Sequence, residues 1–169
     1  MTYMDDNFKI SLLSVCGLLE KHSVQYMVIG GTAVAYHGYY RPSTNMDGTI
    51  SEKPDIDIWY NPTYENYFRL INVIESLGRD VTKYREEKIP DPKKSFFKLE
   101  LPDFTLDFLP KTRSKITYPV ASLKKEAIQL DGVNIYFISF DDLIEDKKSS
   151  GRKKDIEDIN ELKNLGNPD

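Results

Sequence analysis

Apolar residues recur along the chain at two spacings, and each spacing predicts a type of element. In residues 7–22 and 64–77 they return every three or four positions, the period of a helix with one buried face. In residues 55–60 they alternate with acidic residues, as in a half-exposed strand. Shorter apolar runs bounded by Gly, Pro, Asn and Asp predict further strands. The predicted helices span 7–22, 32–37, 64–77, 139–148 and 152–165, and the predicted strands span 24–29, 55–60, 95–101, 104–109, 126–130 and 133–138.

Turn and cap residues support this division of the chain. Asp131-Gly132 lies between two apolar runs and predicts a tight hairpin. Ser139 followed by Asp142 resembles a capping box at a helix start. Residues 39–54 are expected to form a loop, and the polar, proline-containing segment 83–94 a mobile one. The order of elements predicts an α/β (α+β) fold, a mixed sheet flanked by helices with a helical pair at the C-terminal end.

Composition narrows the class of protein. The 169 residues, 40% of them hydrophobic, fit a single domain over residues 1–169 that folds without disulfides. The single cysteine, Cys16, excludes an internal disulfide. An acidic N-terminus and the absence of an apolar run of about 20 residues predict a cytoplasmic protein with no membrane span. The net charge of −4 argues against bulk electrostatic binding to DNA, although residues 83–125 carry eleven basic residues against six acidic ones.

Two carboxylates on one predicted strand indicate chemistry. Asp55 and Asp57 are one residue apart, so a strand would project both to the same face and turn Ile56 and Ile58 into the core. Adjacent carboxylates repel each other unless a cation lies between them. Sites rich in carboxylate oxygen suit Mg²⁺ or Mn²⁺. The alternative is a solvated strand face whose acids only discourage edge-to-edge pairing.

Two further motifs accompany the acid pair. Gly30 and Gly31 end a predicted strand and Thr32 begins a helix, an arrangement that lets the backbone approach a phosphate. A plain strand-to-helix turn is the alternative. Asp107 stands in the middle of an apolar strand, where an isolated carboxylate is costly unless it is paired or ligated. It is predicted as a third metal ligand, with a hydrogen-bonded core aspartate as the alternative.

The combination of these motifs resembles the nucleotidyltransferase superfamily that contains DNA polymerase beta and the aminoglycoside and lincosamide nucleotidyltransferases. Further residues look like the branch of abortive-infection toxins: the stretch 30–38 with Arg41 and Thr44, then Asp142 with Lys147, and Gly151-Arg152 with Lys154, Asp155 and Asp158. The resemblance covers roughly residues 24 to 162. One departure is the long separation of Gly31 from Asp55, where residues 45–54 look like an insertion.

The resemblance implies a reaction and a site. A nucleoside monophosphate would pass from a nucleoside triphosphate to a hydroxyl of a small molecule, an RNA or a protein. The catalytic residues, which would also hold Mg²⁺ or Mn²⁺, are Asp55, Asp57 and Asp107. The residues implied in binding the triphosphate are Gly30, Gly31, Thr32, Lys147 and Arg152. For Lys147 and Arg152 the alternative is a solvated helix laced with ion pairs.

Other functions and partners stay open at this stage. The chain could be a toxin-type enzyme with a cognate antitoxin, or a homodimer. The alternative to an enzyme is a catalytically inactive member of the same fold that binds nucleotide or RNA. His37 and His22 are expected to be structural, and the stripe of Tyr64, Tyr67 and Phe68 to be core. Trp59 shares the face of the acid pair and either lines the site or packs under a helix.

Overall fold

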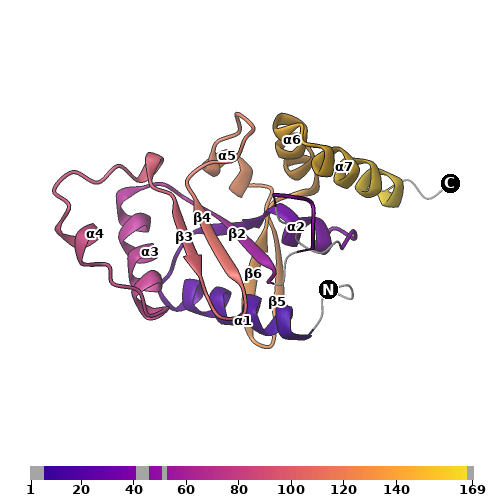
Figure 1. Cartoon of the computed structure of the whole chain (residues 1–169). Helices are drawn as coiled ribbons and strands as arrows, with labels where there is room; N and C mark the ends of the chain where they lie inside the picture. Colours follow the sequence, from indigo (N-terminus) through magenta and orange to yellow (C-terminus); the bar gives the residue numbers. More distant parts are fainter. Residues whose placement is uncertain (1–5, 41–45, 51–52, 167–169) are drawn as a thin grey trace.

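One mixed sheet organises the computed structural model, which describes residues 6–40, 46–50 and 53–166. Six strands of these residues join in the order β3-β4-β2-β1-β6-β5 (Figure 1). β1 runs parallel to β6 and β2 parallel to β4, and the remaining neighbours are antiparallel. The strands are β1 Tyr26–Ile29, β2 Asp55–Tyr60, β3 Phe97–Glu100, β4 Thr105–Leu109, β5 Glu126–Leu130 and β6 Val133–Phe137. The predicted mixed sheet is therefore confirmed.

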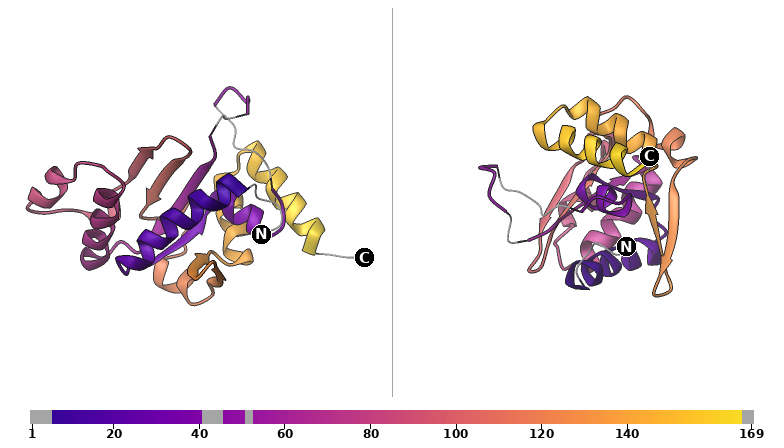
Figure 2. Two further views of the ribbon diagram at one scale, coloured as in Figure 1. Left: turned by 90° about the horizontal axis from the view of Figure 1, so that it is seen from below. Right: turned by 90° about the vertical axis from the view of Figure 1, so that its right-hand side faces the viewer.

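Helices lie on opposite sides of the molecule. α1 and α3 lie on one side of the molecule, and α6 and α7 form a pair on the other (Figures 1 and 2). The helices are α1 Asp6–Lys21, α2 Gly30–Tyr36, α3 Tyr64–Ser76, α4 Thr82–Glu86, α5 Tyr118–Ser122, α6 Phe140–Ser150 and α7 Lys153–Gly166, with a 3₁₀ turn at Pro92–Lys94. Among the helices of the described ranges, none combines the length and apolar composition that crossing a bilayer requires.

Local chemistry accounts for the element ends that the sequence predicted. At the α6 start the Ser139 hydroxyl accepts a hydrogen bond from the backbone N–H of Asp142, 3.3 Å away. α6 runs to Ser150, two residues beyond the expected end, because Gly151 adopts the left-handed conformation (φ +65°) that stops it. The β5–β6 turn has positive φ at both Asp131 and Gly132, as the predicted hairpin requires.

Three expectations about local structure were wrong or incomplete. The segment 83–94 is no simple loop, because it contains most of α4 and the 3₁₀ turn. α5 was not predicted at all, since five residues are too few to show helical periodicity. In the expected core stripe only Tyr67 is buried, at 1% exposure, whereas Tyr64 is 60% and Phe68 38% exposed.

Candidate active site

The sheet brings the three predicted acids together. β2 and β4 run parallel in register, so that Asp57 is opposite Asp107 and Asp55 is opposite Thr105. On the other side of β2, Ile29 at the end of β1 is opposite Asp57, which places the glycine pair beside the acids. Residues opposite each other on neighbouring strands project to the same face. The buried Ile56 and Ile58 confirm that the other face of β2 is core.

Gly30 is required at its position by the acid next to it. Its backbone has a φ of +67°, in the region that favours glycine. A Cβ atom built there would lie 2.3 Å from Oδ2 of Asp57, far inside van der Waals contact. At Gly31 a Cβ would meet no atom within 4 Å. The first glycine therefore makes room for a carboxylate, and the second leaves open space.

Thr32 connects α2 to the acid strand. Its hydroxyl donates to the backbone carbonyl of Asp55 at 3.4 Å, and its side chain is buried. A hydroxyl has one proton, so Thr32 can donate to a phosphate only by turning away from this carbonyl. The Asp55 carboxylate accepts a hydrogen bond from Thr105 of β4.

The electrostatics of the acids favour a cation between them. Burial raises the pKa of Asp57 to about 7, and the neighbouring charges of Asp107 and Asp55 add to the shift. Burial also raises the pKa of Asp107, against the lowering effect of Lys98 across the β3–β4 pair. Oδ1 of Asp107 is one of three buried side-chain oxygens of the described residues that lack a hydrogen-bond partner. Such an oxygen is a natural ligand for a metal ion.

The described residues do not present a preformed metal cluster. No group of three His, Cys, Asp or Glu side chains among them has its donor atoms close enough to hold an ion. The donor chemistry of Asp55, Asp57 and Asp107 nevertheless fits Mg²⁺ or Mn²⁺, which take carboxylate oxygens. An ion would have to draw the three carboxylates together.

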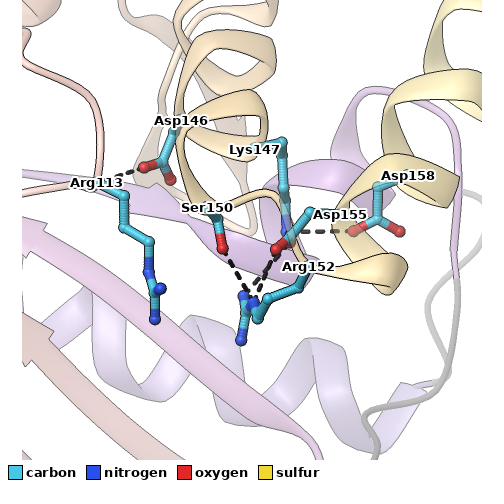
Figure 3. Close-up of polar contacts among 7 residues, drawn as sticks. All are labelled: Arg113, Asp146, Lys147, Ser150, Arg152, Asp155 and Asp158. Carbon is cyan, nitrogen blue, oxygen red and sulfur yellow. Dashed lines mark hydrogen bonds and ion pairs between the residues drawn. The ribbon is translucent and has the colours of Figure 1, made fainter.

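A buried ion network on α6 and α7 borders the acids. Nζ of Lys147 lies 3.1 Å from Oδ1 of Asp155 and 3.2 Å from Oδ2 of Asp158, and both aspartate side chains are fully buried (Figure 3). Nε of Arg152 lies 2.7 Å from Oδ2 of Asp155 and 3.0 Å from the Ser150 hydroxyl. Burial alone would raise the pKa of Asp155, but its bonds to Arg152, Ser150 and Lys147 hold that pKa well below its ordinary value. The predicted alternative of a solvated helix laced with ion pairs is wrong for this cluster.

Two cavities meet at the carboxylates. The first, of about 220 Å³, includes Gly31, Thr32, Asp55 and Lys154 in its lining. The second, of about 300 Å³, extends toward β4 and α6. Both are lined by Gly30, Asp57, Asp107, Lys147 and Arg152. The structure therefore brings every predicted site residue to one place, although their roles rest on the proposal below.

Other candidates from the sequence lie elsewhere. His37 lines neither cavity, and its Nε2 atom is 2.9 Å from the Ile138 carbonyl oxygen. His22 contacts the Ser76 hydroxyl. Trp59 is 1% exposed and packs edge-on against Tyr118 of α5, which decides between its two predicted positions. Arg41, Thr44 and part of the proposed 45–54 insertion lie outside the described residues.

Sequence reasoning missed the residues that distinguish the second cavity. They are Ile29, Phe96, Leu109, Arg113, Asp146, Ser150 and Asp155. Of these, the sequence had drawn attention to Asp155, through its family motif. Arg113 follows β4 in a stretch with three basic residues, where nothing in the spacing separates one base from another. Only the fold shows that Arg113 lines the cavity next to the carboxylates.

Comparisons with known proteins add the fold family. No protein-family profile matches the chain, and no curated protein matches it in sequence. The solution structure of the antibiotic-resistance factor ANT(2″)-Ia is similar, with a TM-score of 0.59, 17% identity, and coverage of 96% of this chain and 86% of that one. A crystal structure of ANT(2″)-Ia with adenylyl-2″-tobramycin has a TM-score of 0.52, 17% identity, and coverage of 95% and 90%.

A third similar structure is that of a different adenylyltransferase, named for lincosamide antibiotics. The lincomycin-bound lincosamide antibiotic adenylyltransferase LnuA has a TM-score of 0.51 and 18% identity, and the match covers 90% of this chain and 94% of that one. At these identities the likeness shows the fold and leaves the substrate of this chain open. The chain has the nucleotidyltransferase fold that its sequence motifs predicted.

Proposed function

We propose that the chain is a metal-dependent nucleotidyltransferase that moves a nucleoside monophosphate from a nucleoside triphosphate to an acceptor hydroxyl. One observation carries the proposal: three carboxylates from two adjacent strands line one cavity with a glycine that makes room for Asp57, and an oxygen of Asp107 is buried without a hydrogen-bond partner. The adenylyltransferase activity in the name of LnuA supports the same reaction class by likeness of fold alone.

The proposed step balances as a group transfer. The acceptor oxygen forms a bond to the α-phosphorus, the bond from that phosphorus to the bridging oxygen of the β-phosphate breaks, and pyrophosphate leaves. Asp107 would help to take the hydroxyl proton, because burial raises the pKa of its carboxylate. Asp55, Asp57 and Asp107 would hold the divalent ions. Bound ions would neutralise charge on the phosphates and lower the barrier to attack.

Other residues would bind the triphosphate in the first cavity. The backbone at Gly31 leaves space for a phosphate group next to Gly30, which makes room for Asp57, and the Thr32 hydroxyl could donate to that phosphate after rotating. Lys147 has three N–H groups and uses two on Asp155 and Asp158, so its third can bind a phosphate oxygen. Arg152 is 48% exposed and would do the same with its outer edge.

A transfer assay tests the proposal. The protein is incubated with Mg²⁺ or Mn²⁺, each labelled nucleoside triphosphate, and fractions of total RNA, small molecules or protein. We expect label to enter one fraction or the protein itself, and Asp57→Asn to abolish that transfer. Asp103→Asn, which removes an exposed acid at the β3–β4 turn, is the matched control and should keep it.

Two results would contradict this proposal, the first its assigned site and the second its enzymatic activity. If Asp57→Asn transfers label as well as the wild type does, the assigned site is wrong. If metal-dependent nucleotide binding occurs and no fraction is labelled, the inactive nucleotide-binding alternative is correct. A toxin role, a cognate antitoxin, a homodimer and a cytoplasmic location stay predictions.

A further inference from the structure

The second cavity is lined by Arg113, a positively charged side chain that has no role in the proposed reaction. It lies beside the carboxylates toward α6, and Arg113, Asp146 and Phe96 line it but not the first cavity. If the triphosphate lies against Gly31 and Thr32 in the first cavity, the acceptor can approach the carboxylates through the second cavity. Its volume of about 300 Å³ is at the lower end for a small-molecule site.

Arg113 is held in place through its backbone. Its N–H donates to Oδ1 of Asp146 on α6 at 2.7 Å, which fixes the chain that follows β4 (Figure 3). The guanidinium projects away from Asp146, to the same side as that of Arg152 (Figure 3). Within residues 6–40, 46–50 and 53–166 no carboxylate lies within ion-pair distance of the Arg113 guanidinium.

The acids around the second cavity already have partners or a role. Asp146 accepts the Arg113 amide, and Asp155 is bound by Lys147 and Arg152. Asp57 and Asp107 belong to the proposed metal site. The outer edge of Arg152 is assigned to the triphosphate, so what the cavity adds for a second ligand is the guanidinium of Arg113, whose planar donors suit phosphate. Phe96, 52% exposed, adds an apolar wall.

We propose that the second cavity is the acceptor site and that it selects an acceptor carrying a phosphate group near the reacting hydroxyl. This inference rests on the proposed function, since it names the second substrate of that site. Arg113 is then a specificity-determining residue. A polycationic acceptor such as tobramycin would meet the guanidinium of Arg113, and the repulsion between like charges would disfavour its binding.

Direct binding without nucleotide or metal tests the inference. Ribose 5-phosphate and ribose form a matched pair of probes that differ only in the phosphate, and tobramycin is the polycationic probe. Calorimetric titration should show binding of ribose 5-phosphate to the wild type and at least about tenfold weaker binding of ribose and tobramycin. Arg113→Glu should weaken ribose 5-phosphate binding by at least about tenfold. Lys111→Glu makes the same charge change at an exposed base outside both cavities and should leave binding within about twofold.

The outcomes separate this inference from the proposed reaction. Tighter binding of tobramycin, no binding of ribose 5-phosphate at millimolar concentration, or equal weakening by Arg113→Glu and Lys111→Glu would each overturn it. Affinity for ATP with Mg²⁺ is measured on the same variants. The affinity of Arg113→Glu for ATP with Mg²⁺ should stay within about twofold of the wild-type value. A tenfold loss of that affinity would show that Arg113 binds the nucleotide, and the inference would be rejected. If the proposed reaction itself is wrong, the transfer assay shows it, because no fraction is labelled or Asp57→Asn transfers label as well as the wild type does.

Discussion

At the scale of single residues, the site depends on a glycine that packs against a carboxylate. Gly30 combines a positive φ with a Cβ position that Asp57 already fills, so two independent constraints exclude a side chain there. Gly31 is subject to neither constraint. The two glycines of the motif therefore do different things, although the sequence presents them as a pair.

Alanine at each glycine separates these roles. Gly30→Ala should lower the free energy of unfolding by about 2 kcal/mol or more, because the new methyl group strains the backbone and displaces Asp57. Gly31→Ala should leave it unchanged or raise it by up to about 1 kcal/mol, since a helix prefers alanine. Urea denaturation measures both, and equal losses would show that the close approach of Gly30 to Asp57 has no energetic effect.

Asp57 itself should make stability depend on pH. Its pKa is about 7 in the folded protein against an ordinary value of 3.8, so between these values the folded chain holds a proton that the unfolded chain has lost. The free energy of unfolding should therefore fall as pH rises from 4 to 7. Asp57→Asn removes the effect, and without metal it should be more stable than the wild type at pH 8 by about 1 to 3 kcal/mol, with a smaller difference at pH 5. Parallel pH profiles for the two proteins would contradict this.

At the scale of elements, the α6–α7 pair holds a buried charge network beside the acids. The break at Gly151 ends α6 and lets α7 begin at Lys153, which turns Asp155 and Asp158 toward Lys147. Lys147 offsets the charge of both buried carboxylates, and Arg152 offsets that of Asp155. The same arrangement aims cations at the proposed phosphates.

Removing the central cation should therefore destabilise the protein. Lys147→Met removes the buried cation that lies between Asp155 and Asp158, and we expect a loss of about 3 to 5 kcal/mol in the free energy of unfolding. Lys148→Met, one residue along, removes an exposed lysine paired only with Glu145 and should cost less than about 1 kcal/mol. Thermal and urea unfolding compare them. Equal stability of the two variants would mean that the network is not a net support of the fold.

At the scale of the whole molecule, the strand order gathers parts of the chain that are distant in sequence. Placing β2 between β1 and β4 puts Gly30, Asp57 and Asp107 side by side, and α6 then brings Lys147 next to them. The basic segment 83–125 does not act as one patch. Its Arg113 lines the second cavity, whereas Lys83 and Lys98 line another cavity with Arg79, and Lys98 is also opposite Asp107. The charge of this segment therefore supports specific contacts better than a broad RNA-binding surface.

The sequence by itself predicted most of the elements, the faces of β2 and most of the residues that line the first cavity around the three acids. Periodicity, capping and turn chemistry are local, so residues a few positions apart suffice to predict α3, the start of α6 and the β5–β6 hairpin. The same local rule placed Asp55 and Asp57 on one face. The short helix α5 could not be predicted in this way, because five residues are too few to show a periodic pattern.

Only the tertiary structure decided which residues meet and in which state of charge. The register of β2 against β4 set Asp107 opposite Asp57, and burial at that point raises the pKa of both. The fold also buried Asp155 and Asp158, which look like ordinary surface charges in the sequence, and selected Arg113 from several nearby bases. Burial and proximity arise from contacts between distant segments, and charge interactions depend on both, so no local pattern could have settled them.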